Sequence, residues 1–431
     1  TSILFLSGYV VVLLPVILYS GSVAISGMFN VPELLGVSSE TGIVICVWGI
    51  GIIGAIYAVF GGLKAVAVSD SINAIGLLIG GILIPVLGLI AIGDGSMMEG
   101  LSIITTENPE KFKSMGGPTD PVPFYTIFTG MMLVQLFYWG TNQQIIQRAL
   151  GAKNLVEGQK GLLLASFIKI LGPLIVVLPG LIAYHMFNGS LENADEAYPM
   201  LVNKVLPAPL LGFFAAVLFG AILSSFNSVL NSSVTLFGID IYKQHINPEA
   251  DERTIVKYGK TFGIVLAIMA MFIAPFIAKA GSLFAYLQEV NGIYSIPILT
   301  IIVVGYTTKR VPAIAAKLGL VFGCLLYIIS QFFMQPYFVD SALASAAAAG
   351  VTDEAALALV KAQAYPHFLD VMAILFVLNV VIMLIIGKIR PRETDYVQAY
   401  TGQVDITPWK YVKQVGIAIC IIVIGVYIYF A

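Results

Sequence analysis

The residues best suited to binding a polar molecule lie at the end of one apolar segment, from Tyr138 to Arg148. This stretch reads Tyr-Trp-Gly-Thr-Asn-Gln-Gln-Ile-Ile-Gln-Arg. Amide side chains are unfavourable in hydrocarbon unless they have partners, so the cluster indicates a polar interior. Gly140 lies where a helix can break, and a break frees backbone groups that must line a cavity. The alternative is an ordinary helix end in the headgroup region; for Gln135, Tyr138 and Asn142 the interior position is favoured.

Ionisable residues also lie inside apolar segments. Lys169 is in the middle of one, ahead of Pro173, and Asp70 and the Gln288-Glu289 pair lie in two others. An ionisable residue within a membrane segment indicates function, because it must be paired or face water. For Lys169 the alternative is a buried structural ion pair. No nucleophile lies beside a base in a pattern typical of an enzyme.

A third group consists of small hydroxyl residues. Ala221, Ser224, Ser225 and Ser228 share one face at helical spacing. A hard alkali cation binds oxygen atoms from hydroxyls, amides, carboxylates and backbone carbonyls, so this face suits sodium. Close packing of helices through small residues is the competing interpretation.

Apolar runs long enough to span a bilayer position these residues. We expect about eleven spans, at 2–29, 42–59, 66–93, 123–147, 159–186, 208–240, 255–279, 283–306, 312–335, 366–388 and 411–430.

The composition agrees with this interpretation. The chain has 431 residues, of which 58% are hydrophobic and 11% charged, whereas soluble domains carry about 25% charged residues. We therefore predict an all-α polytopic membrane protein, with the lipid bilayer as its surroundings and no nucleic-acid partner. The three cysteines and three histidines are scattered, so no metal site other than sodium is expected.

The basic residues predict the orientation. Sixteen lysines and arginines fall on one alternating set of connections and five on the other, with Lys169 inside a helix. The richer side is cytoplasmic by the positive-inside rule. Eleven spans then place Thr1 in the cytoplasm and Ala431 outside a cytoplasmic membrane. Because the chain starts inside an apolar run without methionine, we expect that its natural beginning is missing.

Several motifs together resemble the sodium:solute symporter family, and most closely its sodium/glucose and sodium/galactose branch. They are Gly61-Gly62-Leu63-x-Ala65, Tyr138-Trp139-Gly140-x-Asn142-Gln143, Ala221-x-x-Ser224-Ser225 and Phe284-x-x-x-Gln288. The resemblance implies two inverted five-helix repeats of the LeuT type, with sites on broken helices near the membrane midplane. It assigns 1–93 to the last three helices of the first repeat, 94–122 to an outer loop, 123–306 to the second repeat and 307–431 to three accessory helices.

The resemblance also implies site residues. Sugar contacts fall on Gln135, Asn142, Lys169 and Gln288, and aromatic gates on Tyr138, Trp139 and Phe284. Sodium falls on Ala221, Ser224 and Ser225, and a possible second sodium on Asp70, Asn227 and Ser228. Gln135 stands where the galactose transporter has asparagine, so its exact hydroxyl pattern is open.

The function that this resemblance implies is sodium-coupled symport of a sugar by alternating access, with sodium as coupling ion and no cofactor. A symporter of the same fold for myo-inositol, sialic acid, proline or pantothenate is the nearest alternative. A membrane solute sensor is a more distant one. The oligomeric state is open.

Overall fold

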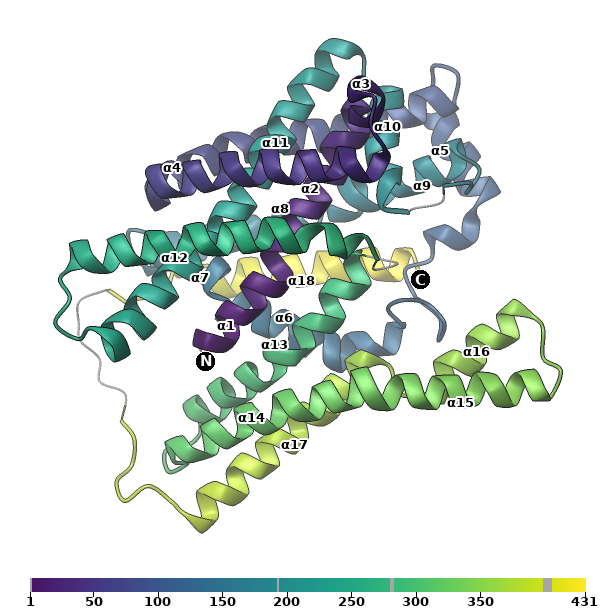
Figure 1. Cartoon of the computed structure of the whole chain (residues 1–431). Coiled ribbons are helices and arrows are strands. Elements are labelled where there is room, and N and C mark those ends of the chain that lie inside the picture. Colours follow the sequence, from purple (N-terminus) through teal and green to yellow (C-terminus); the bar gives the residue numbers. More distant parts are fainter. Residues whose placement is uncertain (1, 192–193, 280–282, 398–404) are drawn as a thin grey trace. The chain divides into compact units, whose positions relative to one another are not determined.

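The computed structural model describes residues 2–191, 194–279, 283–397 and 405–431, with the side chains of these ranges except 59–69, 194, 279, 284 and 285. The described residues form helices and connecting turns, with no strand among them (Figure 1). Contacts divide the chain into a larger unit, Ser2–Lys113 with Leu163–Leu287, and a smaller unit, Ser114–Leu162 with Gln288–Ala431.

The larger unit contains most of the long helices. Its elements are α1 (Ser2–Gly8), η1 (Tyr9–Leu13), α2 (Leu14–Phe29), α3 (Val31–Leu35), α4 (Ser39–Ile92), α5 (Met97–Glu107), η2 (Pro109–Phe112), η4 (Pro173–Val177), α9 (Leu178–Met186), η5 (Ala194–Glu196), α10 (Ala197–Val205), α11 (Ala208–Thr235), η6 (Leu236–Ile246), α12 (Glu252–Ile273) and η7 (Ala274–Lys279). Helix α8 (Leu155–Lys169) and helix α13 (Leu283–Thr307) each run from one unit into the other.

Glycines on α4 let α11 pack closely against it. A Cβ atom on Gly80 would lie 2.2 Å from the Phe214 ring, and one on Gly76 would lie 2.7 Å from Val217. Phe214 in turn belongs to a buried apolar cluster with Ile84 and Ile182. Small residues thus let the two helix backbones approach closely. Such close packing holds helices together in a membrane, where the hydrophobic effect does not drive them together.

The smaller unit is built from shorter elements. They are η3 (Phe124–Phe128), α6 (Gly130–Thr141), α7 (Gln143–Leu150), α14 (Ala313–Ile329), η8 (Ser330–Met334), α15 (Gln335–Ala348), α16 (Glu354–Ala364), α17 (Phe368–Ile389) and α18 (Val412–Tyr429). Its main core joins α6, α13, α14 and α17 through Val134, Ile296, Tyr327 and Met372.

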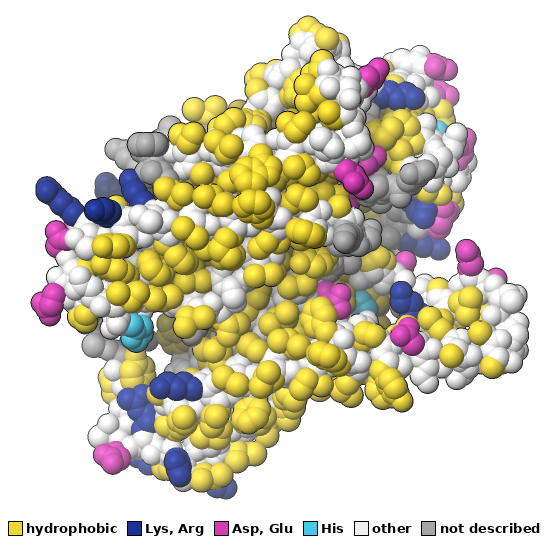
Figure 2. Space-filling model, in the orientation of Figure 1, with side chains coloured by type: hydrophobic (Ala, Val, Ile, Leu, Met, Phe, Trp, Pro, Cys, Tyr) yellow, Lys and Arg dark blue, Asp and Glu magenta, His cyan; other side chains and the backbone are white. Residues whose placement is uncertain are grey.

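Nine described helices are long and apolar enough to span a membrane, or ten if α8 and the 173–186 segment, bent by 45° against each other, form one span. Apolar side chains accordingly cover much of the face shown in Figure 2. The chain is therefore a multi-pass membrane protein, as the composition predicts.

The expected spans 42–59 and 66–93 lie in the single helix α4, and the expected span at 123–147 also differs from the prediction. The segment at 123–147 is not one helix: η3, α6 and α7 follow one another, and the longest piece, α6, has 12 residues. The break falls at Asn142, whose φ of −71° and ψ of 119° are extended. The interruption expected near Gly140 is present, two residues further on. The assignment of the chain to repeats at 1–93, 123–306 and 307–431 stays a prediction.

Candidate functional site

Two glutamines from segments far apart in the sequence meet at one methionine in the smaller unit. The Nε2 atom of Gln135 lies 3.6 Å from Sδ of Met131, and Nε2 of Gln288 lies 4.0 Å from the same sulfur. Residues 131 and 135 share a face of α6 because they are one turn apart. We call Gln135 and Gln288 the amide pair. The sequence analysis predicts both glutamines as solute contacts. It does not single out Met131, although the spacing of four residues from Gln135 places the two on one helix face.

Trp139 orients the Gln135 side of this pair. Its Nε1 donates a hydrogen bond of 3.0 Å to Oε1 of Gln135. This bond occupies the amide oxygen, so the Nε2 group is directed toward Met131. Tyr138 places its ring edge-on to Trp139 with centroids 5.4 Å apart. The two predicted gate aromatics of α6 therefore contact each other beside the amide pair.

The opposite face of α6 fixes the helix to α13. Phe137 packs edge-on against Tyr294, with ring centroids 5.9 Å apart, and each side chain is only 3% exposed. The Tyr294 hydroxyl also donates to Oδ1 of Asn291. Because the rings are anchored on α6 and α13, the positions of Gln135 and Gln288 depend on this contact.

Asn142 caps the start of helix α7. Its Oδ1 accepts a hydrogen bond of 3.0 Å from the backbone nitrogen of Gln144, which caps the start of α7. The side chain is 2% exposed. The cap explains why an asparagine stands at the helix break; its assignment as a sugar contact stays a prediction.

A tyrosine on α14 holds the turn of α13 that carries Gln288. The hydroxyl of Tyr327 donates a hydrogen bond of 2.8 Å to the backbone oxygen of Glu289. A Cβ atom on Gly292 would lie 2.2 Å from the Tyr327 ring. Glycine at 292 is thus required for the close approach of Tyr327. The sequence does not single out Tyr327, since its importance arises only from the helix opposite.

Lys169 and Phe284 belong to the larger unit. Lys169 is the last residue of α8, just before the 45° bend, and its side chain is exposed. The side chain of Phe284 lies outside the described residues. Participation of these two residues in solute binding remains a prediction.

The predicted sodium residues follow one another on α11. Ala221 and Ser224 are partly buried, and Ser225 is exposed. The hydroxyl of Ser228 donates to the backbone oxygen of Ser224 at 2.6 Å. The Ser228 oxygen is therefore directed back along its own helix.

The residues proposed for a second ion lie on α4 and α11. Asn227 is 0% exposed, and neither its amide nitrogen nor its amide oxygen has a hydrogen-bond partner in the described part of the chain. The two helices touch where a Cβ on Gly220 would meet the Asn73 side chain. Asp70 lies three residues before Asn73, so it approaches the level of Ser224. A buried, unsatisfied amide at this level is unfavourable unless something binds there.

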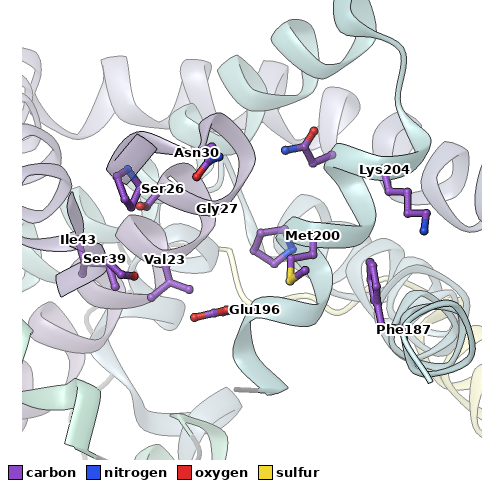
Figure 3. Close-up of a pocket in the computed structure, with 13 residues that line it drawn as sticks. Val23, Ser26, Gly27, Asn30, Ser39, Ile43, Phe187, Glu196, Met200 and Lys204 are labelled. Carbon is purple, nitrogen blue, oxygen red and sulfur yellow. The ribbon is translucent and has the colours of Figure 1, made fainter. Parts of the chain in front are cut away.

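A cavity in the described part of the chain lies elsewhere. It has a volume of about 530 Å³ in the larger unit and is lined by residues of α2, α4 and α10 (Figure 3). Glu196 and Lys204 supply opposite charges, and the Lys204 ammonium lies 5.4 Å from the centre of the Phe187 ring. None of the predicted sugar or sodium residues lines this cavity.

Up to ten spans among the described residues define a polytopic membrane protein, and the amides beside its broken helix suit a polar solute. Comparison with known proteins names the family. The family model described as the sodium:solute symporter family matches residues 2–323. The chain belongs to the sodium:solute symporter family, whose members are transporters and not enzymes.

Three relatives illustrate the range of the family. The uncharacterized symporter YidK of Escherichia coli (strain K12) is 46% identical over 96% of this chain, which spans 68% of YidK. The sodium/glucose cotransporter of Vibrio parahaemolyticus is 33% identical over 74% of this chain, and the match covers 61% of that protein. The mouse sodium/myo-inositol cotransporter 2 is 29% identical over 76% of this chain and 52% of its own length.

A solved structure confirms the fold. The substrate-bound, outward-open structure of a Na⁺-coupled sialic acid symporter matches with a TM-score of 0.63 at 16% identity, over 91% of this chain and 75% of the other. The protein therefore has the inverted-repeat, LeuT-type helical fold that the resemblance implies.

Proposed function

We propose that this protein couples the inward movement of sodium to that of a sugar resembling glucose or galactose, by alternating access. One observation carries the proposal: the amide pair, Gln135 and Gln288, converges from α6 and α13. Two amides at one place offer donors and acceptors to neighbouring hydroxyls of one solute.

The partner of the amide pair supports a polyhydroxylated solute. The thioether of Met131 is a weak hydrogen-bond acceptor, and its distances of 3.6 and 4.0 Å to the two amide nitrogens are long. A sugar hydroxyl is a stronger acceptor, so the amide nitrogens form stronger hydrogen bonds when the hydroxyl replaces the sulfur as their partner. The adjacent rings of Tyr138 and Trp139 provide the apolar surface that covers a pyranose face.

The proposed sodium site lies on α11. Ser224, Ser225 and the carbonyl of Ala221 supply the hard oxygen ligands that the ion prefers. An ion that binds one state of the transporter better than the other shifts the protein toward that state. If this state also binds the solute better, sodium raises the affinity of the protein for the solute, and the solute raises its affinity for sodium. Release on the cytoplasmic side, where sodium is low, then resets the cycle.

Myo-inositol is the second candidate solute. It is a carbocyclic polyol without a ring oxygen, and the sequence similarity to the mouse sodium/myo-inositol cotransporter 2 favours it. The amide pair suits either solute, since both present adjacent hydroxyls.

Uptake into proteoliposomes tests the proposal. The full-length protein is reconstituted, and labelled glucose, galactose, myo-inositol, sialic acid and proline are offered with and without a sodium gradient. We expect sodium-dependent uptake of a hexose, and we expect Gln135→Ala and Gln288→Ala each to raise the half-saturating solute concentration about ten-fold or more, because each loses hydrogen bonds of about 1–1.5 kcal/mol.

The matched control is Gln363→Ala, which removes an exposed amide of α16. It should transport as the unmodified protein does. Sodium-dependent uptake of proline with no hexose uptake would contradict the sugar assignment, and equal effects of all three alanine variants would remove the amide pair from the site.

A further inference from the structure

A second cavity lies at the other end of α13. Its volume is about 350 Å³, and it is in the smaller unit. Its walls combine apolar residues of three helices with one arginine and one tyrosine of the segment after α17. They are Ile301, Ile302, Gly305, Tyr306, Thr308, Val311, Pro312, Ala313, Ala316, Met383, Arg392 and Tyr396.

Defined contacts hold the polar wall in place. The backbone nitrogen of Arg392 donates to the oxygen of Arg310 at 2.9 Å, and that of Tyr396 donates to the oxygen of Lys309 at 3.0 Å. The Arg392 guanidinium lies 5.2 Å from the centre of the Tyr396 ring. The segment at 392–396 is therefore fastened to the α13–α14 connection.

The charge around this cavity is strongly positive. Positions 305–320 and 384–397 contain six basic residues, Lys309, Arg310, Lys317, Lys388, Arg390 and Arg392, against the acidic Glu393 and Asp395. Asp395 is bonded to Arg310 at 2.7 Å, and this hydrogen bond and charge hold the pKa of the carboxyl below its usual range. Figure 2 shows lysine and arginine side chains gathered at one end of the smaller unit. The excess charge attracts an anion.

The cavity also lies where a bilayer ends. It is formed at the end of the Tyr286–Thr307 span and the start of the Ala313–Ala348 span. Tyr306 is 75% exposed on its rim, as is typical of residues at the headgroup level. The lysine and arginine count predicts this side to be cytoplasmic.

From these observations we infer that the cavity binds the phosphate head group of an anionic phospholipid from the inner leaflet. Basic pockets between helices on the cytoplasmic side suit anionic head groups. Arg392 offers planar paired donors to a phosphate. The positive end of the α14 dipole at Pro312 and Ala313 adds attraction, while Ile301, Ile302 and Met383 offer surface to the adjoining acyl chain.

Lipid binding to the delipidated full-length protein tests the inference. Phosphatidylglycerol and phosphatidylcholine are added in a zwitterionic detergent, and bound lipid is counted by native mass spectrometry. We expect preferential retention of phosphatidylglycerol and about five-fold weaker binding by Arg392→Gln, the effect of one basic residue near a head group. Lys361→Gln makes the same charge change on α16 and should bind as the unmodified protein does.

A second variant tests the cavity without altering charge. A Cβ at Gly305 meets nothing within 4 Å, so Gly305→Leu folds and fills the space, and we expect it to lose the retained phosphatidylglycerol. Unchanged binding in both Gly305→Leu and Arg392→Gln overturns the inference. Equal weakening by Lys361→Gln also overturns it, as a general charge effect, and equally tight binding of soluble glycerol phosphate would show that the occupant is not a lipid.

Discussion

The two adjacent serines of α11 differ in their surroundings. The carbonyl of Ser224 already accepts the Ser228 hydroxyl at 2.6 Å, whereas Ser225 is exposed. If Ser225 coordinates sodium, its exposed hydroxyl supplies one of the oxygen ligands. If the serines serve packing alone, the exposed one contributes little.

Replacement of Ser225 distinguishes these roles. We expect Ser225→Ala to raise the sodium concentration for half-maximal uptake at least ten-fold, since one oxygen ligand is lost, while thermal stability in detergent stays within about 0.5 kcal/mol, as for an ordinary surface change. Sodium titration of solute uptake measures the effect. Ser345→Ala, at an exposed serine of α15, is the control. A sodium dependence identical to that of the control would assign Ser225 to packing.

At the scale of elements, α13 has one fastened end and one weakened point. Tyr327 bonds to the Glu289 carbonyl, and Pro297 lies inside the same helix. A proline within a helix removes the hydrogen bond to the carbonyl four residues earlier, here Ile293. The Tyr327 bond therefore supports the turn that carries Gln288 on a helix that lacks one of its own hydrogen bonds nearby.

The change Tyr327→Phe tests this arrangement because it removes one hydroxyl and keeps the ring that packs on Gly292. We expect faster amide hydrogen exchange across residues 286–296 and a solute half-saturation raised about five-fold, in line with a net hydrogen bond of about 1 kcal/mol. Exchange mass spectrometry measures the first effect whatever the solute.

Tyr365→Phe is the matched control for Tyr327→Phe. Its hydroxyl is hydrogen-bonded to Ser330 of η8 at 2.8 Å, in the same unit and away from the Glu289 carbonyl. This variant should leave exchange in 286–296 unchanged. If the two variants accelerate it equally, the effect is general loosening of the unit and Tyr327 has no special role.

At the scale of the whole molecule, the path of residues 124–150 decides the topology. Among the described residues nine helices pass by length and composition, or ten if the bent 155–186 pair is one span, and the η3–α6–α7 segment does not. Broken helices cross a membrane only where protein or a water-filled cavity covers them. We expect this segment to cross, because its amides belong to the solute site proposed above, and the two ends of the chain then lie on opposite sides.

Reporter fusions test this prediction by showing on which side of the membrane each end of the chain lies. A green fluorescent protein joined before Thr1 should fluoresce, and one joined after Ala431 should not, while alkaline phosphatase should be active only at Ala431. A fluorescent fusion at both ends would place 124–150 on one side of the membrane. Fusions in the 309–312 and 351–353 connections serve as internal references, for which we expect cytoplasmic and external locations.

Local sequence patterns predicted much of this protein. Among the described residues, apolar runs located nine of the eleven expected spans, or ten if the bent 155–186 pair is one span, because the bilayer requires about 20 apolar residues in succession. Gly140 indicated the helix break, which falls two residues further on at Asn142. The motifs from Gly61 to Gln288 identified the sodium:solute symporter family, which the family model over residues 2–323 confirms.

Only the tertiary structure decided which of these residues meet. Gln135 and Gln288 are far apart in the sequence, and their common neighbour Met131 is an ordinary apolar residue, 157 positions before Gln288. Likewise, Gly292 and Tyr327 acquire meaning only from the 2.2 Å approach that a Cβ at 292 would make to that ring. Hydrophobic periodicity records which face of a helix is buried, whereas the contact between two helices depends on the shapes of side chains that are remote in the sequence. The sequence alone therefore determined the membrane class, most of the spans and the family, and the packing of α6, α13 and α14 determined the amide pair.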